Sequence, residues 1–106
     1  MQNELTIRDK TSTTPRLVRL PLGQIVATPG ALETLEEAGQ LPQEFISRHA
    51  RLEQGELTNE DYRENLFSVN KSLRIFSAYK TARGVKLWII TEADRSATTI
   101  LLPEEY

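Results

Sequence analysis

The chain has 106 residues, of which 39% are hydrophobic and 26% charged, and its net charge is −2. This length and composition fit one small globular domain. The absence of cysteine and the presence of a single histidine exclude disulfides, thiolate catalysis and metal sites rich in Cys or His. The slightly acidic balance argues against a broad nucleic-acid-binding face, which needs clustered Lys and Arg.

No apolar run approaches the roughly 18 residues of a membrane span, and the first ten residues lack the apolar core of a signal peptide. We therefore expect a cytoplasmic protein that does not enter a membrane. Residues 1–16 are polar and rich in Ser and Thr, which predicts a flexible N-terminal tail. Residues 17–106 then form a single domain.

Three helices are predicted after a short apolar segment. That segment, Gln24–Ala27, follows Pro21 and Gly23 and is a candidate strand at a sheet edge. The first helix opens at Thr28-Pro29, where threonine suits the N-cap and proline the first helical position, and it stops at Gly39. A second helix starts at Pro42 and stops before Gly55. Its apolar stripe is Leu41, Phe45, His49 and Leu52.

The third helix has the clearest start signal. Thr58 and Asp61 have the spacing of a capping box, and an apolar stripe at helical period follows. We place this helix at Asn59–Lys71. Its predicted stripe consists of Tyr62, Leu66, Val69 and Leu73.

After this helix the hydrophobic period changes to two. Residues 73–80, 85–92 and 97–102 are rich in β-branched and aromatic residues and are separated by short turns. Such short connections predict an antiparallel meander. The predicted fold class is α+β, with helices followed by a three-stranded antiparallel meander and an additional N-terminal edge strand at Gln24–Ala27.

The simplest registers pair Lys80 with Val85 and Glu92 with Ala97. Alternation then gives two faces, and both are apolar. One face carries Phe76, Ala78, Leu87, Ile89, Ile100 and Leu102; the other carries Ile75, Tyr79, Trp88, Ile90 and Leu101. Either helices cover both faces, or one face binds a partner protein around Trp88 and Tyr79, since these residue types are enriched at interface hot spots.

The same register places Arg74, Thr91 and Thr98 together beside the loop that contains Asp94 and Arg95. A cation with neighbouring hydroxyls is able to hold an anionic group such as a phosphate. The structural alternative is that Asp94 and Arg95 satisfy the turn backbone, while the threonines form an ordinary cross-strand pair.

His49 also has two interpretations. It lies on the apolar stripe of its helix, where a buried, hydrogen-bonded histidine is common; a catalytic histidine would need a second group within hydrogen-bond reach. No phosphate-loop, dinucleotide-binding, nucleophile-elbow or zinc-protease motif is present, so we expect neither cofactor nor metal and do not favour an enzyme.

The segment Lys86–Tyr106, KLWIITEADRSATTILLPEEY, resembles the closing signature of a family of small "plasmid-related" proteins of bacterial plasmids, phages and integrative elements. The segments LPLGQIVATPGALE and RIFSAY extend this resemblance toward residue 17. The resemblance implies a mobile-genetic-element context. Within it, we expect the C-terminal residue Tyr106 to pack against the domain or a second copy, with Arg74, Lys86 and Arg95 as candidate polar partners.

The leading functional hypothesis is a small non-enzymatic interaction protein that inhibits or modulates a host defence or nucleic-acid-processing protein. Its partner would be a protein encoded by the host or the element, and a homodimer is the other candidate. The alternative is a small endoribonuclease of the toxin type. In that case His49 would act as general acid or base, and Arg74 or Arg95 would stabilise the phosphate charge.

Overall fold

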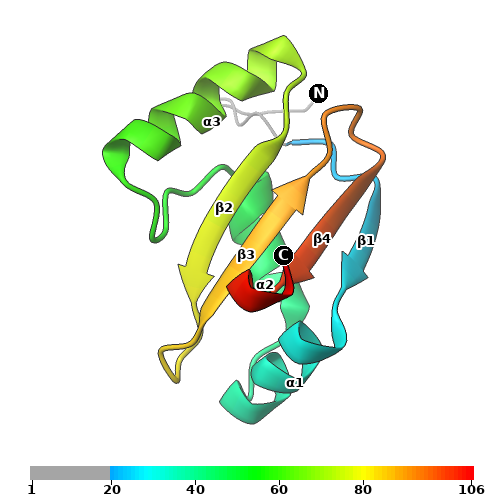
Figure 1. Ribbon diagram of the computed structural model, residues 1–106, viewed down its shortest axis with the longest axis vertical. Coiled ribbons are helices and arrows are strands. Elements are labelled where there is room, and N and C mark those ends of the chain that lie inside the picture. The colour runs from blue at the N-terminus through cyan, green and yellow to red at the C-terminus, as the bar shows by residue number, and fades with distance from the viewer. Residues whose placement is uncertain (1–19) are drawn as a thin grey trace, which may run out of the picture.

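The computed structural model describes residues 20–106, and the predicted tail at residues 1–16 lies outside this part. The described chain folds into a four-stranded sheet with helices around it (Figure 1). In chain order the elements are β1 (Gln24–Ala27), α1 (Pro29–Ala38), α2 (Pro42–Ala50), α3 (Asn59–Lys71), β2 (Ile75–Lys80), β3 (Lys86–Thr91), β4 (Ala97–Leu101) and a 3₁₀ turn, η1 (Pro103–Glu105). No helix within residues 20–106 is long and apolar enough to cross a membrane.

The sheet has the strand order β1-β4-β3-β2. The predicted α+β class is confirmed, and β2, β3 and β4 form the antiparallel meander. The edge strand β1 occupies the predicted residues, but it pairs in parallel with β4, so the sheet is mixed. Backbone hydrogen bonds from Gln24 N to Ser96 O and from Thr28 N to Ile100 O, both 3.0 Å long, fasten its two ends.

The helix starts follow the expected capping chemistry. Thr28 and Thr58 have extended backbones, and their hydroxyls accept hydrogen bonds from Ala31 N and Asp61 N. The third helix has the predicted bounds. The second ends earlier than its apolar stripe suggested, at Ala50, because Leu52 adopts a left-handed conformation with φ 59°.

The register between β2 and β3 differs from the prediction by one residue. Lys80 pairs with Lys86, whereas the predicted pairing of Glu92 with Ala97 at the next turn agrees with the observed register. The first hairpin closes at Thr81 and Val85 through a 2.9 Å bond from Thr81 N to Val85 O. Between them lies a three-residue loop in which Gly84 N donates to Thr81 O at 2.8 Å and Gly84 has φ 81°. Three-residue hairpin loops commonly end in such a left-handed residue.

A one-residue slip moves every side chain of a strand to the opposite face. The face composition predicted for β2 was therefore wrong relative to β3 and β4. The face that we call the helix-covered face carries Ile75, Ser77, Tyr79, Leu87, Ile89, Thr91, Thr98 and Ile100. The opposite face, which we call the pocket face, carries Phe76, Ala78, Trp88, Ile90, Thr99 and Leu101.

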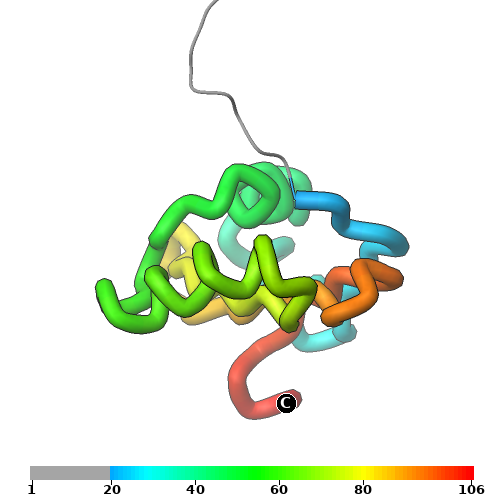
Figure 2. Tube along the Cα trace, turned by 90° about the horizontal axis from the view of Figure 1, so that it is seen from above, coloured from blue at the N-terminus to red at the C-terminus, as the bar shows by residue number. Residues whose placement is uncertain are grey.

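Helices α1 and α2 pack on the helix-covered face. Ala31 and Leu35 of α1 and Phe45 of α2 form one buried cluster with sheet residues such as Tyr79 and Ile89. Helix α2 and the C-terminal segment lie on opposite sides of the sheet (Figure 2). The main core therefore lies between the helices and the helix-covered face.

Helix α3 lies beside the edge strand β2 (Figure 1). Its predicted apolar stripe is not its buried side: Leu66 and Leu73 are exposed, whereas Asn65 and Ser68 are buried. The Asn65 amide donates to Phe76 O, and its oxygen accepts a 3.0 Å hydrogen bond from Phe76 N. An edge strand presents backbone N–H and C=O groups that no neighbouring strand pairs. A polar side chain such as that of Asn65 is buried here because it supplies hydrogen bonds to these groups.

Candidate functional site

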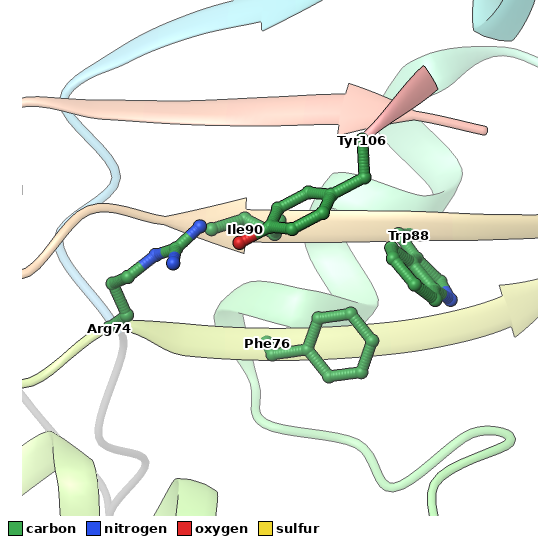
Figure 3. Close-up of a pocket in the computed structure, with 5 residues that line it drawn as sticks. All are labelled: Arg74, Phe76, Trp88, Ile90 and Tyr106. Atoms are coloured by element: carbon green, nitrogen blue, oxygen red, sulfur yellow. The ribbon is translucent and has the colours of Figure 1, made fainter. Parts of the chain in front are cut away.

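The pocket face contains a small cavity of about 230 Å³ (Figure 3). Its lining comes from the start of β2, the middle of β3 and the C-terminal turn. The lining residues are Arg74, Phe76, Trp88, Ile90 and Tyr106. Arg74 directly precedes β2, and the antiparallel β2–β3 pairing positions Phe76, Trp88 and Ile90, with Phe76 opposite Ile90.

The aromatic rings of the pocket meet edge to face. Phe76 and Trp88 have ring centroids 5.0 Å apart at 80°, and Trp88 and Tyr106 have centroids 5.8 Å apart at 70°. Such arrangements are favourable because the positive edge of one ring faces the negative face of the other. Tyr106 remains 70% exposed, so its ring forms a wall of the pocket rather than part of the core.

The η1 turn holds Tyr106 at this place. The carboxylate of Glu105 accepts hydrogen bonds from the Thr28 hydroxyl, from Gly30 N at 3.1 Å and from Leu102 N at 2.9 Å. These bonds fix the turn to the N-terminus of α1 and lower the pKa of Glu105. The expectation that Tyr106 packs against the domain is confirmed.

Arg74 supplies the charge of the pocket. Its guanidinium lies 5.7 Å from the centre of the Tyr106 ring, and its Nε is 3.8 Å from Glu92 Oε1. A hydrogen bond to the Tyr106 side chain raises the pKa of Arg74 above its ordinary value. Of the three cations considered as partners of Tyr106, Arg74 is the one that contacts its ring.

The register separates the two residues predicted to centre a partner surface. Trp88 is half-buried on the pocket face, whereas Tyr79 is fully buried on the helix-covered face. The Tyr79 hydroxyl donates to Glu53 O at 2.9 Å, and the Arg48 guanidinium lies 4.4 Å from the centre of its ring. Tyr79 is thus a core residue, and the prediction that it shares a surface with Trp88 was wrong.

Thr91 and Thr98 are not on the side of Arg74. Both are fully buried on the helix-covered face, where they join His49 in one hydrogen-bond chain. Their hydroxyls lie 2.7 Å apart, and His49 Nε2 is 2.8 Å from Thr91 Oγ1. The predicted anion site made of Arg74 and these threonines therefore does not form.

The donor and acceptor in each bond of this hydrogen-bond chain follow from the Thr98 end. The Thr98 hydroxyl donates to Leu22 O at 2.8 Å, so it accepts from Thr91, which in turn accepts from His49 Nε2–H. His49 Nδ1 then accepts from the Ser77 hydroxyl, 2.7 Å away. Both nitrogens of a neutral imidazole are satisfied, and burial lowers the pKa of His49 to about 4.

Arg95 and Asp94 satisfy backbone groups. Arg95 donates from Nη1 to the carbonyl oxygens of Leu73, Glu92 and Ala93, and from Nη2 to Ser68 O. It thereby binds carbonyls at the C-terminal end of α3, where a cation is favourable. Asp94 accepts from Ser96 N at 3.0 Å. Hydrogen bonding to the Ser96 side chain, and then to its backbone N–H, lowers the pKa of Asp94. The geometry of this loop therefore agrees with the structural alternative, in which Asp94 and Arg95 satisfy backbone groups of the turn.

Of the predicted binding residues, Trp88 and Arg74 meet in the pocket, and Tyr106 joins them as expected. Phe76 and Ile90 were not considered as site residues. The alternation of apolar residues along the strands indicated that both side chains lie on a sheet face. The predicted β2–β3 register, however, placed Phe76 on the face opposite Trp88. The three residues of the endoribonuclease alternative do not converge: His49 is in the core, Arg95 caps α3 and Arg74 lines the pocket.

Comparison of the chain with protein-family models, with curated proteins and with solved structures finds no match. An apolar, partly open cavity with one cation at its rim is able to receive an apolar group. Residues 20–106 contain no group of three or more His, Asp or Glu side chains that could hold a metal ion.

Proposed function

We propose that this chain is a small interaction protein that binds a partner protein through the aromatic pocket on its pocket face. The observation that carries this proposal is the composition of the pocket. Arg74, Trp88 and Tyr106 belong to the three residue types most enriched at interface hot spots, and all three line one cavity. Tyr106 at 70% exposure is also an aromatic ring left largely in solvent.

The size of the cavity supports a protein partner over a cofactor. Its volume of about 230 Å³ is below the roughly 300–1,000 Å³ of pockets that bury drug-sized ligands. It has room for one large side chain, as hot-spot pockets do. The resemblance to plasmid-related proteins motivates the rest of the proposal: the partner is a host or element-encoded protein, such as a defence or nucleic-acid-processing protein that the chain inhibits or modulates.

The endoribonuclease alternative has no comparable support among the described residues. A general base must reach the proton that it removes, and His49 is fully buried with both ring nitrogens hydrogen-bonded to hydroxyl groups. A cytoplasmic location stays a prediction.

The test is affinity capture from a bacterial lysate with four immobilised baits: the wild-type chain, Trp88→Ala, Tyr106→Ala and Leu41→Ala. Leu41 is an exposed apolar residue, 69% accessible, that does not line the pocket, and it serves as the matched control. We expect a protein that binds the wild type and Leu41→Ala but binds both pocket variants at least tenfold less.

Tyr106→Ala removes an exposed ring, so its loss of binding cannot be attributed to unfolding of the core. The proposal is wrong if no protein shows this pattern, or if the captured proteins bind all four baits equally.

A further inference from the structure

The pocket also indicates what a partner must present to it, and this inference rests on the proposed function. Phe76, Trp88 and Ile90 make its floor and wall apolar, and polar atoms at the rim come from Tyr106 and Arg74 (Figure 3). An inserted group must therefore be apolar over most of its surface. An aromatic ring fits best, because it is able to continue the edge-to-face contacts that the resident rings already make.

The rim of the pocket favours a ligand that carries a negative charge. The Arg74 guanidinium faces the Tyr106 ring, and its partner Glu92 is 3.8 Å away. The side chains of Arg74 and Glu92 are 48% and 47% exposed. The contact with Glu92 is long and joins exposed groups, so it contributes little. The hydrogen bond of Arg74 to Tyr106 leaves other N–H donors of the guanidinium for a second partner. A carboxylate from outside is therefore able to replace Glu92 at small cost and to gain two parallel hydrogen bonds from the guanidinium.

We propose that the pocket binds an aromatic side chain of the partner protein whose neighbouring residue is acidic, with the ring against Phe76 and Trp88 and the carboxylate on Arg74. The competing possibility is a cation, since three aromatic rings near one another also attract positive charge. Arg74 opposes that possibility because its own charge lies at the rim of the same cavity.

The test uses three blocked dipeptides that differ in one side chain: N-acetyl-Asp-Phe-amide, N-acetyl-Asn-Phe-amide and N-acetyl-Lys-Phe-amide. Trp88 is the only tryptophan of the chain, so its indole N–H signal in an NMR titration reports directly on the pocket. We expect the Asp peptide to bind up to about fivefold more tightly than the Asn peptide, the upper end for an ion pair between exposed groups. The Lys peptide should bind most weakly.

Two variants show whether Arg74 is the cause. In Arg74→Gln the Asp and Asn peptides should bind within about twofold of each other. Lys80→Gln is the matched control, because Lys80 lies at the other end of β2 and has an equivalent exposed pair, 3.8 Å from Glu56. It removes the same charge outside the pocket and should keep the preference of the wild type for the Asp peptide.

The inference is overturned if Asp and Asn peptides bind the wild type equally, if the Lys peptide binds best, or if Arg74→Gln keeps the preference. It is also overturned if no peptide moves the Trp88 signal. Any of these results leaves the proposed function to be judged by the capture experiment, in which the partner is not restricted to an acidic segment.

Discussion

His49 is the residue whose surroundings most constrain the behaviour of the protein. It is fully buried, its two nitrogens contact the hydroxyls of Ser77 and Thr91, and no carboxylate is among these contacts. Burial without a counter-charge disfavours the imidazolium, which explains why the pKa falls from 6.5 to about 4.

This depressed pKa predicts acid sensitivity in a defined range. Between pH 6.5 and pH 4 the unfolded chain binds a proton at His49 and the folded chain does not, so the free energy of unfolding decreases as the pH falls. Between pH 7 and pH 5 we expect a loss of about 2 kcal/mol, measured by urea unfolding. Glu53, Asp94 and Glu105, whose pKa values are lowered, lose their contributions only at more acidic pH.

His49→Gln is the control, because glutamine retains hydrogen-bonding groups but does not titrate. The variant should be less stable than the wild type at pH 7 and nearly independent of pH down to pH 5. Parallel pH dependences of the two proteins would contradict the assignment of the effect to His49, which is the only histidine of the chain.

At the scale of elements, the Asn65 side chain attaches α3 to the backbone of the edge strand β2 through two hydrogen bonds. Asn65→Ala removes both bonds to Phe76 and leaves part-buried backbone groups without them. We expect a loss of about 1–3 kcal/mol in the free energy of unfolding and faster hydrogen exchange of the Phe76 amide. Exchange measured by NMR, together with urea unfolding, checks both.

Asn70→Ala is the matched control, since Asn70 lies on the same helix and is exposed. It should leave the exchange rate of Phe76 unchanged. Equal rates in the wild type and Asn65→Ala would show that α3 protects the strand edge without this amide.

At the scale of the whole molecule, one face of the sheet is buried in the core and the other lines the pocket. Substitution of one aromatic residue on each face should therefore destabilise the protein by different amounts. Tyr79 is fully buried between α2 and the sheet, so Tyr79→Ala should cost about 3–5 kcal/mol. Trp88 is half-buried at the pocket, and Trp88→Ala should cost less, about 1–2 kcal/mol. Urea unfolding of the two variants measures the difference.

Tyr79→Phe separates packing from hydrogen bonding. It keeps the ring and loses the bond to Glu53 O, so a cost of about 1 kcal/mol is expected. Equal destabilisation by Tyr79→Ala and Trp88→Ala would contradict the assignment of the two residues to different faces.

Local features of the chain were predictable from its residues. The bounds of α3, the start of α1 at Thr28-Pro29 and the strand at Gln24–Ala27 all depend on chemistry within a few positions. The Glu92–Ala97 register also agrees with the structure. The predicted β2–β3 register does not, because the residues around Gly84 are compatible with a four-residue or a three-residue hairpin loop. The one-residue error in register placed Phe76 and Tyr79 on the wrong faces relative to β3.

Sequence by itself determined the helix caps, the periodicities and the residue types available for a site, because these are properties of neighbouring positions. Only the tertiary structure decided where those side chains point. It brought Arg74, Phe76 and Trp88 beside Tyr106, and it enclosed His49 with hydroxyl groups from Ser77 and Thr91. Such contacts join positions far apart in the chain, and they depend on strand register and on which face each helix covers, which no local pattern specifies.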